Sequence, residues 1–247
     1  MSHDLVAISA NWEHLSGHYK LLNTIGEGTY AKMKWGQHIP TGTEVAVKIV
    51  KQQGFANLHR LLLREVSRLK ALQHLNIVQL SEVIDNEEPF FLIMEHMSGG
   101  NVLDYLKTHG CKKAKEAQGV FRQLVPAMHY CHQRGIAHRE LKLQNVLFNS
   151  KMNAKIADFG FSTKFSASKL STICGSPFYA ALELFLGHES DGPAVDTWRL
   201  GVMLYGVVPG TLPFKGSTWR QLGQQVLQGK YAIPFFLSLK WKTSKKN

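Results

Sequence analysis

The chain has 247 residues, 44% of them hydrophobic, and a formal net charge of +11 at neutral pH. This size suits one domain with two lobes, or two small domains. No stretch approaches the roughly 18 consecutive apolar residues of a membrane-spanning helix, because glycines and prolines interrupt the longest candidate, Leu200 to Phe214. Cys111, Cys131 and Cys174 form no C-x-x-C pair, so we expect neither a disulfide framework nor a zinc site, and a reducing cytoplasmic or nuclear setting.

The positive charge has two interpretations. An excess of this size attracts nucleic acid, anionic lipid or acidic proteins. Basic residues are nevertheless spread along the chain, which favours a diffusely basic surface, and no zinc, helix-turn-helix or stacked-aromatic motif supports nucleic-acid binding. One cluster near the end is either a frayed tail or an electrostatic or nuclear-localisation patch: Lys240, Lys242, Lys245 and Lys246.

The predicted elements change in type along the chain. Residues 1–18 are expected to form a loose extension. The pattern then predicts a helix near Ala56 to Gln73 among short strands, which are expected at Lys20 to Ile25, Lys32 to Gln37, Glu44 to Val50, Ile77 to Val83 and Phe90 to Met94.

A Gly-containing joint, Met97 to Gly100, separates this strand-rich part from a part with helical periodicity. Such an α+β arrangement places a ligand cleft at the joint. The helices are expected at Val102 to Thr108, Lys115 to Arg134, Val195 to Val207 and Trp219 to Gln228.

Two short polar segments carry the strongest chemical signal. The first runs from His138 to Asn145, and the second is Asp158-Phe159-Gly160. Strands at 146–148 and 154–157 around a polar turn predict a hairpin that brings Asn145 and Asp158 together. An amide oxygen and a carboxylate suit Mg²⁺ carrying nucleotide phosphates. Glu140 and Lys142 would lie beside this site, where a hydroxyl nucleophile approaches.

Gly26 and Gly28 lie between two predicted strands. Glycines at alternate positions let backbone amides approach phosphate oxygens closely. An ordinary glycine turn explains the motif alone equally well, so this signal depends on its context.

Lys48 and Glu65 are expected to form an ion pair. Strand alternation puts Lys48 on one face of its strand, where a solvent-facing lysine is the simpler alternative. Glu65, however, lies in an apolar helical stripe, and a carboxylate on a buried face is costly unless it is paired. The stripe consists of Leu58, Leu61, Leu62, Leu69 and Leu72.

These motifs occur in the order and spacing of eukaryotic protein kinases, which the chain resembles from Tyr19 to Phe236. In detail it is similar to the microtubule-affinity-regulating kinases, a branch of the AMP-activated kinase group, and to sperm-motility-type kinases. The segments that carry the resemblance are IGEGTYAKMKWG, EVAVKIV, LLREVSRL, HLNIVQL, FLIMEHMSGGNVLDYL, YCHQRGIAHRELKLQNVLF, KIADFGFS, TICGSPFYAALELF and GPAVDTWRLGVMLY.

The resemblance implies a bilobal kinase fold. Its N-lobe would span 19–95, its hinge 95–100, and its C-lobe 101–236, without the last helices of the family. An extension, 1–18, and a basic tail, 237–247, would flank it. ATP and Mg²⁺ would be the cofactors, Ser or Thr hydroxyls of proteins the acceptors, and an upstream kinase would phosphorylate Thr172 so that the surrounding loop orders against Arg139.

The resemblance also implies roles for single residues. Lys48, oriented by Glu65, would hold the α- and β-phosphates, and Lys142 would stabilise the transferring phosphoryl group. Asn145 and Asp158 would bind Mg²⁺. Asp196 would anchor the catalytic loop and Glu140 would orient the nucleophile. The positions expected around the nucleotide are Ile25, Gly26, Glu27, Gly28, Met33, Ala46, Met94, Glu95, Met97 and Leu147.

Several positions depart from the family. Glu140 stands where kinases have Asp, and a displacement on the order of 1 Å at this contact can cost about 100-fold in rate. Asn101 and Gln144 are neutral where acidic residues commonly read basic residues of the substrate, so we expect a weaker preference for basic peptides.

Three further departures bear on folding. Pro126 lies inside a predicted helix, at a cost of about 3 kcal/mol or more. Arg199 lies in an apolar helix, where a charge needs a partner or a route to solvent. Leu182 replaces a proline, and Glu183 is expected to lack its usual partner. With Glu140, these changes favour the alternative of a pseudokinase scaffold that binds nucleotide or a partner without efficient transfer.

Overall fold

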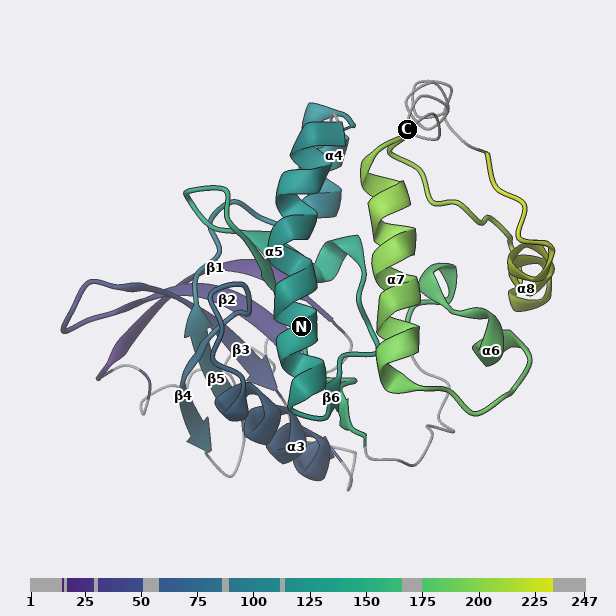
Figure 1. Ribbon diagram of the computed structural model, residues 1–247. Helices are drawn as coiled ribbons and strands as arrows, with labels where there is room; N and C mark the ends of the chain where they lie inside the picture. The colour runs from purple at the N-terminus through teal and green to yellow at the C-terminus, as the bar shows by residue number, and fades with distance from the viewer. Residues whose placement is uncertain are drawn as a thin grey trace, which may run out of the picture. The chain divides into compact units, whose positions relative to one another are not determined.

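The computed structural model of the protein describes residues 15, 17–28, 31–50, 58–85, 89–111, 114–165 and 175–232. The chain forms two compact units. The first contains the described residues up to Gly99 together with Phe148–Gly160, and the second contains Gly100–Leu147 and the described residues from Phe161 onward. The first is rich in strands and the second in helices, which confirms the predicted α+β class (Figure 1).

The first unit is built on an antiparallel sheet of five strands in the order β1-β2-β3-β5-β4. In this register Lys48, on the central strand, lies opposite Met33 on one side and Leu92 on the other. The strands are β1 (Tyr19–Glu27), β2 (Ala31–His38), β3 (Glu44–Val50), β4 (Leu80–Asp85) and β5 (Phe90–Glu95).

Alternation along β3 decides which side chains enter the core. Val45, Val47 and Ile49 are buried in one cluster with Phe91 and Ile93 of β5. Because successive strand residues point to opposite faces, Lys48 is directed to the other face of the sheet. The hydrophobic pattern of β3 thereby orients the lysine.

Helix α3 (Leu58–Ala71) carries the predicted stripe. The buried residues of its described part recur at helical spacing, and Glu65 is among them at 5% exposure, with Leu62, Val66 and Leu69. Leu72, just past the helix end, is also buried. The predicted helix start at Ala56 lies outside the described residues.

The strand predicted at Ile77 to Val83 begins later, at Leu80. Ile77 instead forms an isolated bridge with Ile156, a residue of β8 (Ala154–Ile156). The Val78 amide donates to the Ile156 carbonyl at 2.9 Å. Long-range pairing therefore takes this segment out of the sheet.

In the second unit, helix α5 (Ala114–Gln133) packs against α7 (Gly192–Val207) (Figure 1). Helix α5 continues through Pro126, because its buried face, which includes Leu124 and Met128, holds it in place by tertiary packing. Helix α7 starts earlier than predicted, with Pro193 in its first turn, where the missing amide hydrogen bond carries no cost.

The remaining elements of the second unit are short or peripheral. Figure 1 shows α8 beside α6, and the two are in contact. The part of the chain that the structure describes contains no helix long and apolar enough to cross a membrane. The elements are α4 (Val102–His109), β6 (Ile136–Ala137), η1 (Leu143–Asn145), β7 (Val146–Phe148, whose last residue belongs to the first unit), β9 (Thr163–Lys164), η2 (Pro177–Tyr179), α6 (Leu182–Phe185) and α8 (Trp219–Gln228).

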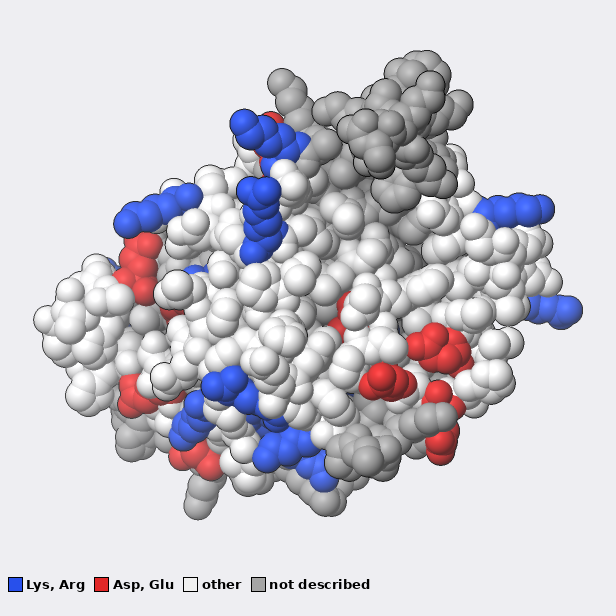
Figure 2. All heavy atoms as spheres, in the orientation of Figure 1, with Lys and Arg blue, Asp and Glu red and all other residues white. Residues whose placement is uncertain are grey.

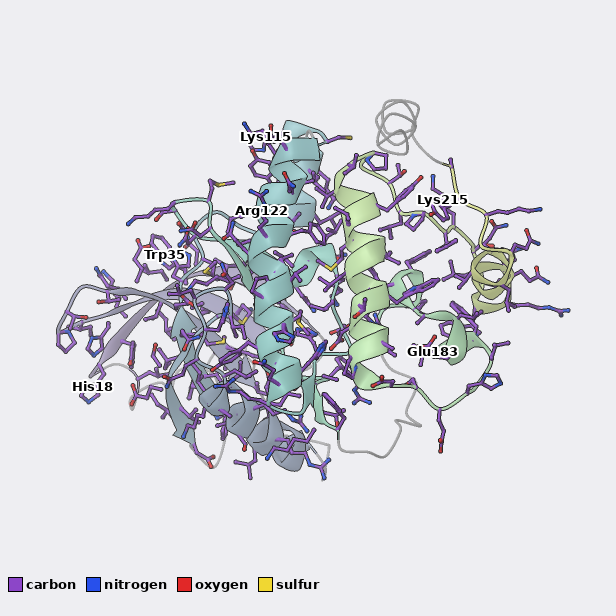
Figure 3. All side chains as sticks on the ribbon, in the orientation of Figure 1. His18, Trp35, Lys115, Arg122, Glu183 and Lys215 are labelled. Carbon is purple, nitrogen blue, oxygen red and sulfur yellow. The ribbon has the colours of Figure 1, made fainter. Side chains whose placement is uncertain are left out.

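Arg199 and Glu183, two of the residues expected to affect folding, differ in burial. Arg199 is fully buried, so it has no route to solvent. Glu183, on α6, is partly exposed and makes no ion pair with another described residue (Figure 3).

The described charged side chains on the face drawn in Figure 2 do not gather into one basic patch. Lysines and arginines occur there in several separate groups, with acidic side chains between them. This face agrees with the diffusely basic interpretation of the net charge. The predicted N-terminal extension, apart from residues 15, 17 and 18, and the lysine-rich tail lie outside the described residues.

Candidate active site

An ion-paired lysine is the centre of the site in the first unit. Lys48 Nζ donates to Glu65 Oε1 at 2.7 Å and lies 3.8 Å from Asp158 Oδ1. The Lys48 and Glu65 side chains are 18% and 6% exposed, so the pair is largely shielded from water. The predicted pairing is thus present, and Asp158 joins it.

The charges around Lys48 set its protonation. Burial disfavours the ammonium form, but the Glu65 carboxylate, followed by Asp158, outweighs burial and raises the pKa of Lys48 above its usual value. The lysine therefore stays cationic throughout the physiological range. A fixed cation held by two carboxylates is suited to contact phosphate oxygens.

Asp158 adopts a backbone conformation that non-glycine residues rarely take. Its φ is 63°, in the left-handed region, and such conformations cost about 1–3 kcal/mol and cluster at functional sites. The next residue, Phe159, is fully buried, and a Cβ added at Gly160 would lie 3.4 Å from Asp158 Oδ1, so Gly160 leaves room for the carboxylate. The carboxylate itself remains 42% exposed and accessible to a ligand.

The glycine-rich turn closes the β1–β2 hairpin. Gly26 pairs with Met33, and the Gly28 amide donates to the Ala31 carbonyl at 2.8 Å. A Cβ on Gly26 or Gly28 would meet no atom nearer than 3.5 Å and 3.7 Å respectively. Packing within the described chain therefore does not demand glycine here, which leaves close approach by a ligand as a reason for it. Thr29 and Tyr30, at the tip, lie outside the described residues.

The other predicted nucleotide-binding positions of the first unit lie on its sheet or just after it. Ala46 pairs with Met94, and Val45 with Glu95, across the β3–β5 ladder. Met97 follows β5 and is buried. The remaining ones are Ile25 and Glu27 on β1, both exposed, and Met33 on β2.

A second set of predicted residues meets in the second unit, around a buried aspartate. Asp196 on α7 is 0% exposed and accepts hydrogen bonds from the His138 and Arg139 amides, both at 2.8 Å. Its Oδ2 also lies 2.9 Å from His132 Nε2 on α5. Two helices thus anchor the loop that carries Glu140. His132 was not among the predicted site residues, and only its helical position was apparent from the sequence.

Within this loop, Glu140, Lys142 and Asn145 contact one another. Lys142 Nζ donates to Glu140 Oε1 at 3.0 Å, and Asn145 Nδ2 donates to the Glu140 carbonyl at 2.9 Å. The Glu140 and Lys142 side chains are only 9% and 20% exposed. Because the Asn145 amide nitrogen is engaged, its oxygen is the atom available to a cation.

Asn145 and Asp158 belong to different units, whose relative positions are not determined. Their predicted meeting around Mg²⁺ therefore stays a prediction, as does the place of Leu147 beside the nucleotide. Among the described residues no group of three or more His, Cys, Asp or Glu side chains could hold a metal. An amide oxygen and one carboxylate are nevertheless the kind of sparse oxygen set that Mg²⁺ accepts when phosphates supply further ligands.

The segment after the predicted regulatory Thr172 packs on the catalytic loop. Thr172 itself lies outside the described residues. Gly175 has φ 86°, and a Cβ there would lie 2.7 Å from the Arg139 carbonyl oxygen and 2.8 Å from Arg199 Nη2. Arg139 Nε in turn donates to the Phe161 carbonyl at 2.9 Å. Only glycine fits at position 175, because both the backbone conformation and the space exclude a side chain.

An apolar pocket of about 320 Å³ lies beside the catalytic loop in the second unit. Gln144, whose neutral side chain replaces an expected acidic one, is part of its wall. None of the described residues that line the pocket is acidic, and its principal apolar residues are Leu103, Leu106, Leu143, Phe178 and Leu212.

The fold and these loops define a protein kinase domain, and sequence comparison agrees. The family described as "Protein kinase domain" matches residues 19–246, so the chain belongs to this family and the predicted resemblance is confirmed. One similar protein is the "Serine/threonine-protein kinase SIK3 homolog" of Danio rerio, which is 48% identical over 225 residues. The match covers 90% of this chain but 19% of that relative, so the chain spans about a fifth of its length.

Proposed function

We propose that the chain is the catalytic domain of a serine/threonine protein kinase, which transfers the γ-phosphoryl group of Mg·ATP to Ser or Thr hydroxyls of proteins. The observation that carries this proposal is the shielded Lys48–Glu65 pair with Asp158 3.8 Å from the lysine. An ion pair that only stabilises the fold needs no third charged residue in a strained backbone conformation. A phosphate-binding site uses the lysine and both carboxylates.

In this mechanism Lys48 binds the α- and β-phosphates and Glu65 keeps it in place. Asn145 and Asp158 would hold Mg²⁺, which neutralises charge on the phosphates when bound. The acceptor hydroxyl oxygen attacks the γ-phosphorus, the bond to the β-phosphate oxygen breaks, and ADP leaves. Glu140 accepts the hydroxyl proton, and Lys142 stabilises charge on the transferring group.

The acceptor is proposed to be a protein segment with apolar rather than strongly basic character. The described wall of the pocket beside Gln144 contains leucines and a phenylalanine and no acidic residue. A peptide array tests this: apolar side chains near the acceptor should increase phosphorylation more than arginines do, and a strong arginine dependence would contradict it.

Activation by an upstream kinase at Thr172, and a reducing cytoplasmic or nuclear setting, belong to the same proposal. Arg139, beside Gly175, is the cation expected to receive a phosphate on this segment. Cys111 and Cys131 are both free thiols.

A pseudokinase scaffold is the second candidate, and one observation favours it. Glu140 is nearly buried and its carboxylate is already paired with Lys142 at 3.0 Å. This pairing restrains the carboxylate from following an acceptor hydroxyl.

Radiolabel transfer from Mg·ATP, with the chain phosphorylated at Thr172, separates the candidates. The matched control is Asp158→Ala, which removes the proposed metal ligand. Activity in the wild type above this control supports the kinase. Equal activity, together with a thermal shift by Mg·ATP, supports the scaffold. Equal activity without a thermal shift means that the chain neither transfers phosphate from the nucleotide nor binds it.

A further inference from the structure

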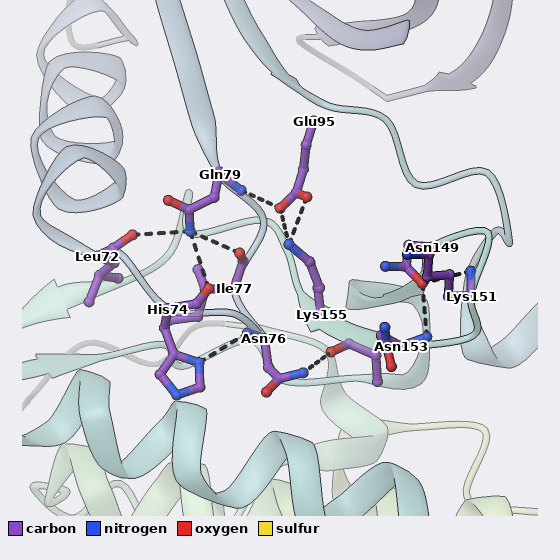
Figure 4. Close-up of polar contacts among 11 residues, drawn as sticks. Leu72, His74, Asn76, Ile77, Gln79, Glu95, Asn149, Lys151, Asn153 and Lys155 are labelled. Atoms are coloured by element: carbon purple, nitrogen blue, oxygen red, sulfur yellow. Dashed lines mark hydrogen bonds and ion pairs between the residues drawn. The ribbon is translucent and has the colours of Figure 1, made fainter. Parts of the chain in front are cut away.

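The side chain of Glu95, at the end of β5, is held by a lysine that lies 60 positions later in the chain. Lys155 Nζ donates to both carboxylate oxygens of Glu95, at 2.8 Å and 2.7 Å, and the Gln79 amide donates to Glu95 Oε1 at 2.7 Å (Figure 4). The Lys155 and Glu95 side chains are 13% and 29% exposed. All three residues belong to the first unit.

The segment before β4 completes this network. Gln79 Nε2 donates to the Ile77 carbonyl at 3.0 Å, and Asn76 Nδ2 donates to the Ala154 carbonyl at 2.8 Å (Figure 4). The Glu95 amide donates to the Gln79 carbonyl at 3.1 Å. Glu95 is thus restrained through its backbone and its side chain together.

The strand that carries Lys155 explains its orientation. Ala154 and Ile156 are fully buried neighbours on β8, so alternation directs Lys155 to the opposite face, toward Glu95. Lys155 is also three residues before Asp158. The ion pair therefore connects the backbone expected to contact the nucleotide base with the strand that leads to the proposed metal ligand.

We propose that Lys155 is a positioning residue for the nucleotide, acting through Glu95. This inference rests on the proposed function. A backbone edge that is held in its binding conformation before the ligand arrives loses less freedom on binding, so the pair increases nucleotide affinity through preorganisation. It contacts no reacting atom, so the rate of transfer in the bound complex does not depend on it.

The pair differs from an ordinary surface ion pair in this structure. Lys107 and Asp104, on α4, are 2.9 Å apart but 65% and 60% exposed, and such pairs contribute little. Lys107→Met is therefore a matched control for Lys155→Met: both remove one paired ammonium, and only one of them lies in the network.

The test measures the Kd of Mg·ATP by competition with a fluorescent nucleotide, and KM and kcat of transfer. Lys155→Met should weaken binding about threefold to tenfold, the loss of a preorganising contact, and raise KM while kcat stays unchanged. Lys155→Arg should restore most of the affinity, because guanidinium forms the same bidentate contact. The double variant Lys155→Met/Glu95→Gln should bind Mg·ATP no more weakly than Lys155→Met alone, because both changes remove the same ion pair.

Hydrogen exchange in the absence of nucleotide keeps this inference separate from the proposed function. Amides at 77–80 and 94–97 should exchange faster in Lys155→Met than in Lys107→Met. If the wild type bound no Mg·ATP, both the proposed function and the role of Lys155 in nucleotide binding would be wrong. Faster exchange in Lys155→Met would in that case still show that Lys155 restrains these amides. If Mg·ATP bound the wild type, Lys155→Met and Lys107→Met equally well, or if it bound the double variant more weakly than Lys155→Met, the proposal for Lys155 would be overturned alone.

Discussion

Replacing Glu65 by leucine removes the carboxylate that keeps Lys48 charged in a shielded position. At 2.7 Å and an effective dielectric constant of about 20, the attraction between the two charges is on the order of 6 kcal/mol, and desolvation offsets much of it. Removing one partner of a buried pair nevertheless costs about 3–5 kcal/mol, because the other charge is left without compensation. Asp158 compensates only weakly, since it is farther away and 42% exposed.

This loss is large against a typical total stability of about 5–15 kcal/mol. Urea unfolding measures it for Glu65→Leu, Lys48→Met and the double variant. We expect the double variant to be more stable than Glu65→Leu, because replacing both charges by apolar groups removes the desolvation cost as well. If Glu65→Leu lost under about 1 kcal/mol, as exposed pairs do, or if the two losses were additive, the shielded-pair reasoning would be wrong.

The pH dependence of this stability has a definite sign. The pKa of Lys48 is raised above 10.5, so its contribution is complete below the ordinary lysine pKa and is lost only as the pH rises through the higher folded value. The difference in stability between the wild type and the double variant Lys48→Met/Glu65→Leu, which lacks both charges, should therefore be constant between about pH 6 and 9. A difference that changed within this range would indicate that another group titrates.

Three further results are expected. Glu140→Asp should raise kcat by roughly tenfold to 100-fold in the transfer assay, because the shorter carboxylate fits the geometry of the family; a lower kcat would show that Glu140 suits this chain better. Gly175→Ala should lower Tm by several degrees, about 1–3 kcal/mol, since its Cβ would lie 2.7 Å from the Arg139 carbonyl oxygen at φ 86°; an unchanged Tm would contradict the packing described here. Burial, assisted by the hydrogen bond to Glu82, raises the pKa of Tyr19 from 10.0 to about 12. Stability that depends on the neutral phenol is therefore lost between these two pH values, and Tyr19→Phe should lose less stability than the wild type from pH 10 to 12. Equal losses in the two proteins would show that other groups dominate in this range.

Local periodicity is sufficient for the Lys48–Glu65 pair. A carboxylate in an apolar helical stripe needs a cationic partner, and a lysine in an alternating strand can supply one, so a single ion pair satisfies both side chains. The same reasoning predicts β3 and α8 with their correct bounds. Both elements have strong patterns that no distant contact alters.

Long-range contacts limit prediction elsewhere. Ile77 is a residue type that favours strands, but it pairs with Ile156, far along the chain, and not with β5. Pro126 should break a helix, but packing along the buried face of α5 keeps the helix continuous. His132 shows its role only when α7 brings Asp196 to it.

The motifs of the chain were sufficient to predict the kinase class and the residue types expected at the site, because their order and spacing resemble those of eukaryotic protein kinases. Tertiary structure alone decided that Lys155 holds Glu95 and that Arg199 lies buried beside Gly175. Each of these depends on segments brought together by folding, and a pairwise contact between distant residues leaves no periodic trace in one chain.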